Sequence, residues 1–187
     1  IKVAINGMGR IGRSTLAAII ESGRSDIEVV SINAPAPIET LVHLMKYDSV
    51  HGRFPGDIKI IGSNIDVGRG QIDMQSTYNP AELNWEGIDV LLECTGVHNS
   101  KEASIIHLEN GAKKVLLSAP GKNVDKTVVY GVNHKELKSD DLIVSNASCT
   151  TNCLAPIAKV LNDAIGIENG IMTTIHSYTG DQPTLDK

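Results

Sequence analysis

The chain has 187 residues, of which 41% are hydrophobic and 21% are charged, and its formal net charge is −5. This globular composition excludes an intrinsically disordered chain, and the acidic balance argues against a general binder of nucleic acid or of anionic membranes. No apolar run approaches the ~20 residues that a membrane-spanning helix needs, so we expect no membrane partner.

Strand and helix patterns alternate at the start of the chain. Apolar runs rich in Val and Ile predict buried strands over residues 2–6 and 28–33, with a helix over residues 10–22 between them. Apolar residues at i, i+3, i+4 and i+7 from Ile38 predict an amphipathic helix. Short alternating runs over residues 57–75 predict hairpins.

The alternation resumes in the middle of the chain. We expect strands over residues 89–93, 114–118, 128–130 and 142–145, and a helix over residues 100–110. Parallel neighbours need crossover connections, so this order of elements predicts an α/β fold. Because crossovers are right-handed, we expect a Rossmann-type, doubly wound, mostly parallel sheet with helices on both faces.

The end of the sequence has too few elements for a core of its own. We expect a helix over residues 149–164 and a strand over residues 170–178. The sequence therefore predicts a dinucleotide-binding domain over residues 1–148, followed at residues 149–187 by the beginning of a second, α+β domain. We also expect the sequence to be the front part of a longer polypeptide.

A glycine-rich turn, GMGRIG from Gly7 to Gly12, joins the first predicted strand to the first predicted helix. Gly7 permits the tight turn, Gly9 lets a pyrophosphate approach the backbone, and Gly12 lets the helix and the strand pack closely. The N-terminus of the helix adds free N–H donors and the positive end of a dipole. In this setting between a strand and a helix, the motif predicts a dinucleotide site.

The acidic residue that holds the adenosine ribose in such sites is absent from the end of the second predicted strand. The strand ends SINAP over residues 31–35, so Asn33 is the side chain left to form a hydrogen bond with the ribose. Without a carboxylate nothing repels a 2′-phosphate, but no Arg or Lys lies between Asp26 and Lys46 to bind one. We therefore expect NAD as the cofactor, with NADP as the alternative.

Cys149 is predicted at the first turn of a helix, where the helix dipole favours the thiolate and lowers the pKa of the thiol. Ser148, Thr150 and Thr151 place hydroxyl groups beside it, which suits an anion or an oxyanion. The alternative interpretation of a free cysteine is a small buried hydrophobe.

His176 follows Cys149 by 27 positions and is a candidate for the base that thiol chemistry needs. The pair predicts oxidation of an aldehyde through a thioester, in which the cysteine adds to the carbonyl and hydride leaves to nicotinamide. Cys94 and Cys153 are expected to be structural. Three cysteines do not make a disulfide framework, and we expect a cytoplasmic protein. The histidines show no metal-site spacing.

Four segments of the chain resemble the glyceraldehyde-3-phosphate dehydrogenases, and the resemblance covers essentially the whole sequence. These segments are AINGMGRIGR from Ala4, KYDSVHGRF from Lys46, SNASCTTNCLAP from Ser145 and HSYTGDQ from His176. The cysteine segment is highly specific to this family and its near relatives. The resemblance makes the predicted second domain the start of a catalytic domain.

The resemblance also implies roles for individual residues. It makes Cys149 the nucleophile and His176 the base that activates the thiol and assists hydride transfer. It implies that Ser148 and Thr150 bind the attacking inorganic phosphate and that Thr179 holds the phosphate of the substrate. The cofactor-lining positions that it implies are Arg10, Ile11, Thr95, Gly96 and Ser118.

The sequence departs from the family at the adenosine side of the cofactor. The family usually carries an aspartate at Ala34 and often an arginine near Tyr78, so the choice between NAD and NADP stays open. Tyr78 is a candidate for stacking on the adenine ring.

The function implied by the resemblance is the phosphorylating oxidation of glyceraldehyde 3-phosphate to 1,3-bisphosphoglycerate with NAD, in glycolysis or gluconeogenesis, by a homotetramer. One alternative is the oxidation of erythrose 4-phosphate, because TGV at residues 95–97 resembles that sister enzyme. The HSYTGD segment favours the glyceraldehyde enzyme instead. A second alternative is a non-catalytic nucleotide-binding module, if the polypeptide ends at Lys187.

Overall fold

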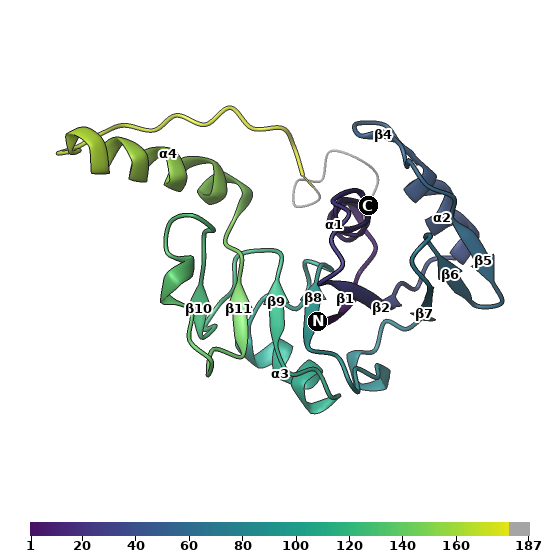
Figure 1. Cartoon of the computed structure of the whole chain (residues 1–187). Helices are drawn as coiled ribbons and strands as arrows, with labels where there is room; N and C mark the ends of the chain where they lie inside the picture. The colour runs from purple at the N-terminus through teal and green to yellow at the C-terminus, as the bar shows by residue number, and fades with distance from the viewer. Residues whose placement is uncertain (180–187) are drawn as a thin grey trace.

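The computed structural model describes residues 1–179 and contains one large, mostly parallel sheet in that part of the chain (Figure 1). Its parallel strands are, in spatial order, β10 (Lys126–Thr127), β11 (Ile143–Ser145), β9 (Val115–Leu117), β8 (Val90–Glu93), β1 (Lys2–Asn6), β2 (Glu28–Asn33) and β7 (Gln71–Gln75). Beyond β7, the sheet continues through the antiparallel strands β6 (Asn64–Asp66) and β5 (Lys59–Ile61). The predicted doubly wound α/β sheet and the predicted hairpins are confirmed.

Four α-helices connect or follow these strands in the described part of the chain. They are α1 (Arg10–Glu21), α2 (Ile38–Lys46), α3 (Lys101–Glu109) and α4 (Cys149–Ile165). Two short strands, β3 (Tyr47–Asp48) and β4 (Gly52–Arg53), form a separate hairpin, and two 3₁₀ turns, η1 (Pro80–Glu82) and η2 (His134–Glu136), lie in loops. No helix of residues 1–179 is both long enough and apolar enough to cross a membrane.

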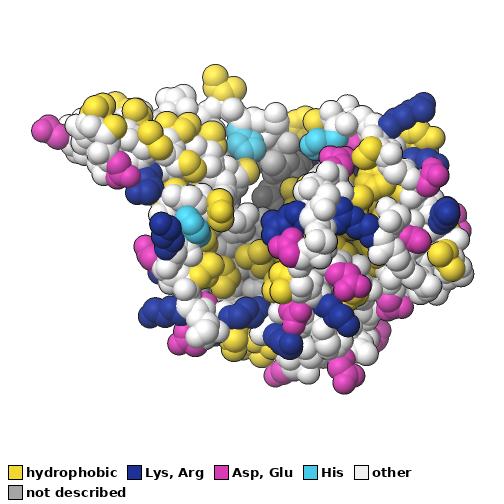
Figure 2. Space-filling view, in the orientation of Figure 1, with side chains coloured by type: hydrophobic (Ala, Val, Ile, Leu, Met, Phe, Trp, Pro, Cys, Tyr) yellow, Lys and Arg dark blue, Asp and Glu magenta, His cyan; other side chains and the backbone are white. Residues whose placement is uncertain are grey.

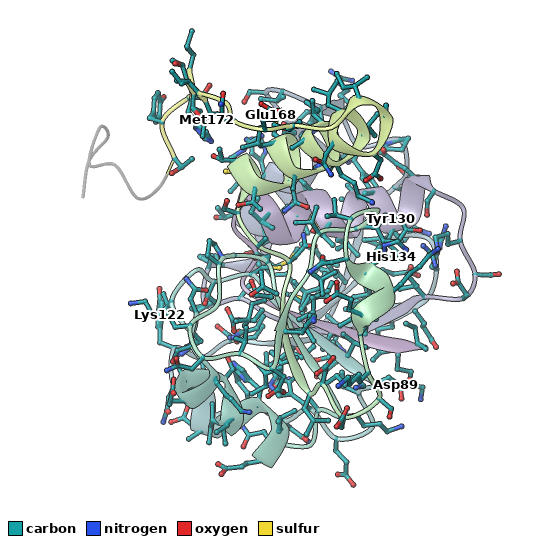
Figure 3. All side chains as sticks on the ribbon, turned by 90° about the vertical axis from the view of Figure 1, so that its left-hand side faces the viewer. Asp89, Lys122, Tyr130, His134, Glu168 and Met172 are labelled. Atoms are coloured by element: carbon teal, nitrogen blue, oxygen red, sulfur yellow. The ribbon has the colours of Figure 1, made fainter. Side chains whose placement is uncertain are left out.

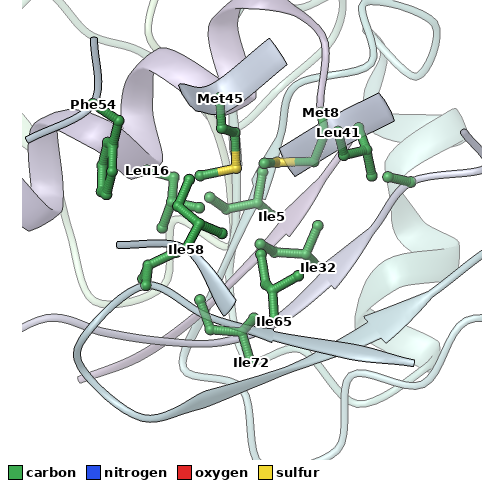
Figure 4. Packing of buried hydrophobic residues seen from close by; sticks show 12 residues of the cluster. Ile5, Met8, Leu16, Ile32, Leu41, Met45, Phe54, Ile58, Ile65 and Ile72 are labelled. Carbon is green, nitrogen blue, oxygen red and sulfur yellow. The ribbon is translucent and has the colours of Figure 1, made fainter. Parts of the chain in front are cut away.

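Both faces of the sheet are buried at β1, as the continuous apolar run of this strand predicts. Successive strand residues point to opposite faces. Ile5 therefore packs with Leu16 of α1 on one face, in the cluster that Figure 4 shows. Ala4, its neighbour in β1, packs on the other face against Trp85 and Leu91. Burying a side chain of the size of Ile5 or Leu16 stabilises the fold by about 1.5–3 kcal/mol relative to leaving it exposed.

The carboxyl ends of the parallel strands form the edge that matters for function. The chain leaves β1 toward β2 on one side and reaches β8 on the other, so a topological switch point lies at β1. Open α/β sheets bind their ligands outside the carboxyl ends of the strands at such a point. The turn from β1 into α1 lies at this edge, and so does the short connection from β11 into α4.

Helix α4 projects from this edge away from the sheet (Figure 1). In the described structure none of its residues is buried, and its exposed apolar side chains are Leu154, Ile157, Val160, Leu161 and Ile165 (Figure 2). Figure 3 shows Glu168 and Met172, on the segment after α4, at the opposite end of the molecule from Asp89, which precedes β8.

Two predicted strands differ from the structure. The strand predicted over residues 170–178 is wrong, because the backbone after α4 pairs with no strand among residues 1–179. Apolar character alone does not make a strand, since a strand needs a hydrogen-bonded neighbour. The strand predicted over residues 128–130 lies earlier, as β10, because the backbone N–H of Val129 bonds to Oδ1 of Asn133 and the chain turns.

The expected domain division at residue 148 falls between β11 and α4. Residues 180–187 of the expected second domain lie outside the described residues.

Candidate active site

The glycine-rich turn has the geometry that a dinucleotide site requires. Gly7 has φ +94°, and a Cβ there would lie 2.8 Å from the backbone nitrogen of Thr95. A Cβ on Gly12 would lie 2.0 Å from the carbonyl oxygen of Gly7, so only glycine fits. Gly9 differs, because a Cβ there would meet nothing within 4 Å. The expected tight turn and close helix packing are therefore confirmed, and open space lies at the central glycine.

The first turn of α1 leaves donors free for an anion. Within the described part of the chain, no side chain caps this helix, whose N-cap residue is Gly9. A pyrophosphate fits such an uncapped N-terminus, since the N–H groups and the helix dipole both favour negative charge.

Arg10 and Ile11 lie at the surface of this turn. The guanidinium of Arg10 forms an ion pair with Asp48, with 3.3 Å between Nη1 and Oδ2. The backbone N–H groups of His51 and Val50, together with Arg10, hold the pKa of Asp48 well below its usual value, although desolvation opposes them. Asp48 is therefore ionised at neutral pH and keeps Arg10 beside the turn.

Asn33 has partners within the protein that the sequence did not predict. Its side chain is buried, and its amide nitrogen donates to Oδ1 of Asn6 at 2.8 Å and to the carbonyl oxygen of Thr77 at 3.0 Å. These two bonds use both amide hydrogens, and Oδ1 accepts the backbone N–H of Thr77 at 3.1 Å, so this side chain is left with only a second lone pair of Oδ1 for a ribose hydroxyl. A polar residue at the end of an otherwise apolar strand is the sequence signal that could have predicted these buried hydrogen bonds.

The other two adenosine-side positions are placed very differently. Ala34 is buried, whereas Tyr78 is 90% exposed. The ring of Tyr78 is thus accessible for stacking.

A cavity of about 350 Å³ joins three segments that the sequence analysis singled out separately. It is lined by Ile11, Thr15, Leu92, Cys94, Leu116, Ser118, Asn146, Ala147, Cys149 and Asn152. The structure therefore brings Ile11 of the glycine-rich turn, Ser118 after β9 and Cys149 of α4 to one place. A second cavity, of about 270 Å³, lies between α1 and the β3–β4 hairpin and contains none of the predicted site residues.

Two of the three cysteines differ sharply in their surroundings within this cavity. Burial raises the pKa of the Cys94 thiol to about 11, although a hydrogen bond with Ser118 opposes the shift. Cys94 is therefore protonated at neutral pH, in agreement with a structural role. Cys149, at the first position of α4, is exposed.

Ser148 explains why α4 begins at Cys149. Its hydroxyl oxygen accepts a hydrogen bond from the backbone N–H of Thr151 at 3.0 Å and lies 2.7 Å from the Thr151 hydroxyl. This N-cap stabilises the first turn by about 1 kcal/mol. The thiol thus stands on the first residue of a capped helix.

Cys149 and His176 are in contact, with 3.2 Å between Sγ and Nε2. The other ring nitrogen of His176 bonds to the carbonyl oxygen of Ser177. A carbonyl oxygen only accepts hydrogen bonds, so Nδ1 of His176 carries the proton. The lone pair of Nε2 therefore faces the thiol, which is the tautomer that a base for Cys149 requires.

The two groups change each other's ionisation. The hydrogen bond between His176 and Cys149, helped by the hydroxyl and backbone N–H of Thr150, lowers the pKa of the Cys149 thiol, although desolvation opposes the shift. The carbonyl oxygen of Ser177, followed by Cys149, raises the pKa of His176. Both shifts favour a thiolate–imidazolium pair, which is the nucleophilic form of a cysteine.

The three expected phosphate-binding residues flank this pair along the chain. Ser148 and Thr150 adjoin Cys149, and Thr179 follows His176 by three positions on the exposed segment after α4. No group of three His, Cys, Asp or Glu side chains that could hold a metal occurs among residues 1–179.

Comparison with known proteins identifies the family. Residues 1–101 match the family described as glyceraldehyde 3-phosphate dehydrogenase, NAD binding domain, and residues 148–187 match the C-terminal domain of the same enzyme. The chain belongs to the glyceraldehyde-3-phosphate dehydrogenase family. The glycine-rich turn lies in the part that matches the NAD binding domain, and Cys149 and His176 lie in the part that matches the C-terminal domain.

Individual relatives agree with this assignment. Over the whole chain, the sequence is 64% identical to a glyceraldehyde-3-phosphate dehydrogenase of Xanthobacter flavus and 63% identical to one of Cereibacter sphaeroides. It is 51% identical to one of Pseudomonas aeruginosa. The chain covers 56% of the first two relatives and 57% of the third, so it spans a little over half of their length.

Proposed function

We propose that this chain contributes the dinucleotide site and the reactive thiol of an NAD-dependent, phosphorylating glyceraldehyde-3-phosphate dehydrogenase. The observation that carries the proposal is the 3.2 Å contact between Sγ of Cys149 and Nε2 of His176. The cavity that Cys149 shares with Ile11 supports it, because the thiol and the glycine-rich turn then serve one site.

The chemistry begins with proton transfer from the Cys149 thiol to Nε2 of His176. The thiolate attacks the aldehyde carbon, a C–S bond forms, and the carbonyl oxygen takes the proton from Nε2 of His176, which gives a thiohemiacetal on Cys149 and leaves His176 neutral. NAD, when bound, supplies the acceptor for the hydride of that carbon. His176 takes the hydroxyl proton as the hydride leaves, and a thioester on Cys149 remains.

Inorganic phosphate completes the reaction. One phosphate oxygen attacks the thioester carbon, the C–S bond breaks with its electron pair on sulfur, and an acyl phosphate leaves. We assign Ser148 and Thr150 to this phosphate because they adjoin the thiol on α4. We assign Thr179 to the phosphate that the substrate already carries.

NAD is the dinucleotide that we propose for this site. Its pyrophosphate is assigned to the backbone at Gly7, Gly9 and Gly12, with Arg10, Ile11, Thr95, Gly96 and Ser118 lining the rest. The buried Ala34 offers the ribose no charge, and the exposed Tyr78 is assigned to the adenine ring.

The larger organisation is also part of the proposal. We place the boundary between the dinucleotide-binding and catalytic domains at residue 148, where the match to the C-terminal domain begins. The assembly that we propose is a homotetramer in the cytoplasm.

The experiment is an assay of the intact protein on glyceraldehyde 3-phosphate with NAD, with and without inorganic phosphate. We expect the formation of reduced cofactor to continue only when phosphate is present, since phosphate releases the thioester. Absence of turnover overturns the proposal. Parallel reactions with erythrose 4-phosphate and with NADP then identify the sister enzyme or the other cofactor.

A further inference from the structure

Three polar residues lie buried side by side beneath the carboxyl edge of the sheet. Asn6, Asn33 and Glu93 are the last residues of β1, β2 and β8, and each is at most 4% exposed. The register places Asn6 opposite both Asn33 and Glu93. Nδ2 of Asn6 donates to Oε2 of Glu93 at 2.6 Å, and Nδ2 of Asn33 donates to Oδ1 of Asn6 at 2.8 Å.

The Glu93 carboxylate has a full set of donors. Oε1 accepts the backbone N–H of Thr95 at 2.7 Å and also the Thr95 hydroxyl. Oε2 accepts a hydrogen bond from Nδ2 of Asn6 and a second one, at 3.1 Å, from Nε2 of His107. The Trp85 indole only donates, and it bonds to Nδ1 of His107 at 3.2 Å, so His107 is neutral and carries its proton on Nε2.

This arrangement keeps Glu93 charged inside the protein. Burial alone raises the pKa of the carboxyl, but the hydrogen bonds from His107, Thr95 and Asn6 more than offset it and leave the pKa lowered. A buried carboxylate is costly unless all its acceptors are satisfied, and an apolar side chain would fill the same space without that cost. Packing alone therefore does not explain why a charged residue occupies this position.

The network holds the loops that surround the proposed dinucleotide site. The backbone of Thr95, which Glu93 holds, lies so close to Gly7 that a Cβ on Gly7 would be 2.8 Å from the Thr95 nitrogen. At the other end, Asn33 bonds to both the backbone N–H and the carbonyl oxygen of Thr77, which directly precedes Tyr78. Hydrogen bonds of these buried side chains thus connect the loop after β7 with the loop after β8, and the loop after β8 lies directly against the glycine-rich turn.

We propose that Glu93, supported by His107, is a positioning residue that fixes the backbone of Thr95 against the glycine-rich turn before the dinucleotide arrives. The inference rests on the proposed function, because it assumes that this edge binds NAD. Glu93 is fully buried and acts through Thr95 rather than by touching the ligand. A site that is already ordered loses less conformational freedom on binding and so binds more tightly.

The substitution Glu93→Gln tests this in the intact protein. It keeps the shape but replaces one acceptor oxygen by an NH₂ group that must face a donor. We expect the NAD dissociation constant, measured by calorimetry, and the KM for NAD to rise about tenfold or more, because bonds to a charged acceptor are lost. We expect kcat at saturating NAD and the rate of Cys149 alkylation by iodoacetamide to stay within about twofold.

The matched control is Glu86→Gln, which makes the same chemical change at an exposed glutamate. We expect this variant to bind NAD as the unmodified protein does. Equal NAD affinity in a folded Glu93→Gln variant overturns the inference. Failure of the unmodified protein to bind NAD overturns the proposed function instead, so the two failures are distinguishable.

Hydrogen exchange of the unmodified protein decides the matter if Glu93→Gln does not fold. Thr95 and Gly96 are both exposed, but Glu93 accepts a hydrogen bond from the N–H of Thr95. Without NAD, the Thr95 N–H should therefore exchange at least about tenfold more slowly than that of Gly96. Equal exchange at the two amides before NAD is added, with protection appearing only afterwards, contradicts a preformed loop and overturns the inference.

Discussion

Replacing Gly12 by alanine should damage the fold itself rather than only the site. The added Cβ would lie 2.0 Å from the carbonyl oxygen of Gly7, whereas contacts under 3.0 Å are essentially never seen. The turn or α1 must therefore move by about 1 Å. Such overpacking costs about 1–3 kcal/mol or more, against which alanine gains about 1 kcal/mol of helix propensity. Because a 2.0 Å approach is a severe clash, the cost belongs at the upper end of this range, about 3 kcal/mol, and the expected net loss in the free energy of unfolding is about 2 kcal/mol.

Gly9→Ala is the matched control for this substitution. Gly9 has φ −66°, which alanine adopts without strain, and a Cβ there would meet nothing within 4 Å. Replacing glycine by alanine at an N-cap position changes stability by about 1 kcal/mol or less. The new methyl group would, however, occupy the space through which the pyrophosphate approaches the backbone. We expect near-normal stability and weakened NAD binding.

Urea unfolding and calorimetry on the intact protein separate the two effects. Gly12→Ala should lower the urea midpoint, while Gly9→Ala should mainly raise the NAD dissociation constant. A Gly12→Ala variant as stable as the unmodified protein would refute the steric argument. Unchanged NAD affinity in Gly9→Ala would show that the pyrophosphate does not lie against this backbone.

Three further substitutions test the chemistry and the cofactor. Cys149→Ser should abolish aldehyde oxidation and leave NAD binding unchanged in calorimetry, and loss of both would make the cysteine structural. His176→Asn should slow turnover by roughly 10²–10⁴. Because His176 lowers the pKa of Cys149, this variant should also move the alkylation profile of the thiol to higher pH, and an unmoved profile would remove His176 from that role. Ala34→Asp should tighten NAD by offering the ribose a carboxylate, which unchanged affinity in calorimetry would contradict.

Much of the fold was predictable because its signals are local. The apolar runs of the strands and the 3.6-residue period of the helices depend on neighbouring residues alone, and they predicted the alternating order of elements. The glycine-rich turn was equally readable, since the steric demands on Gly7 and Gly12 follow from a strand turning directly into a helix.

The errors arose where a distant partner decides the outcome. The segment over residues 170–178 is apolar enough for a strand, but a strand is made by its neighbour, and none pairs with it among residues 1–179. The protein partners of Asn33 were missed for the same reason. Its partners, Asn6 and Thr77, lie 27 and 44 positions away and use both of its amide hydrogens.

The sequence by itself determined the class of fold, the dinucleotide-type turn and the reactive residue types, because these follow from periodicity, backbone sterics and side-chain chemistry. Only the tertiary structure decided which of these groups meet. It placed Nε2 of His176 against Cys149, and the strand register set Asn6 between Asn33 and Glu93. Register depends on hydrogen bonds between strands far apart in the chain, and no local pattern encodes which polar strand ends become neighbours.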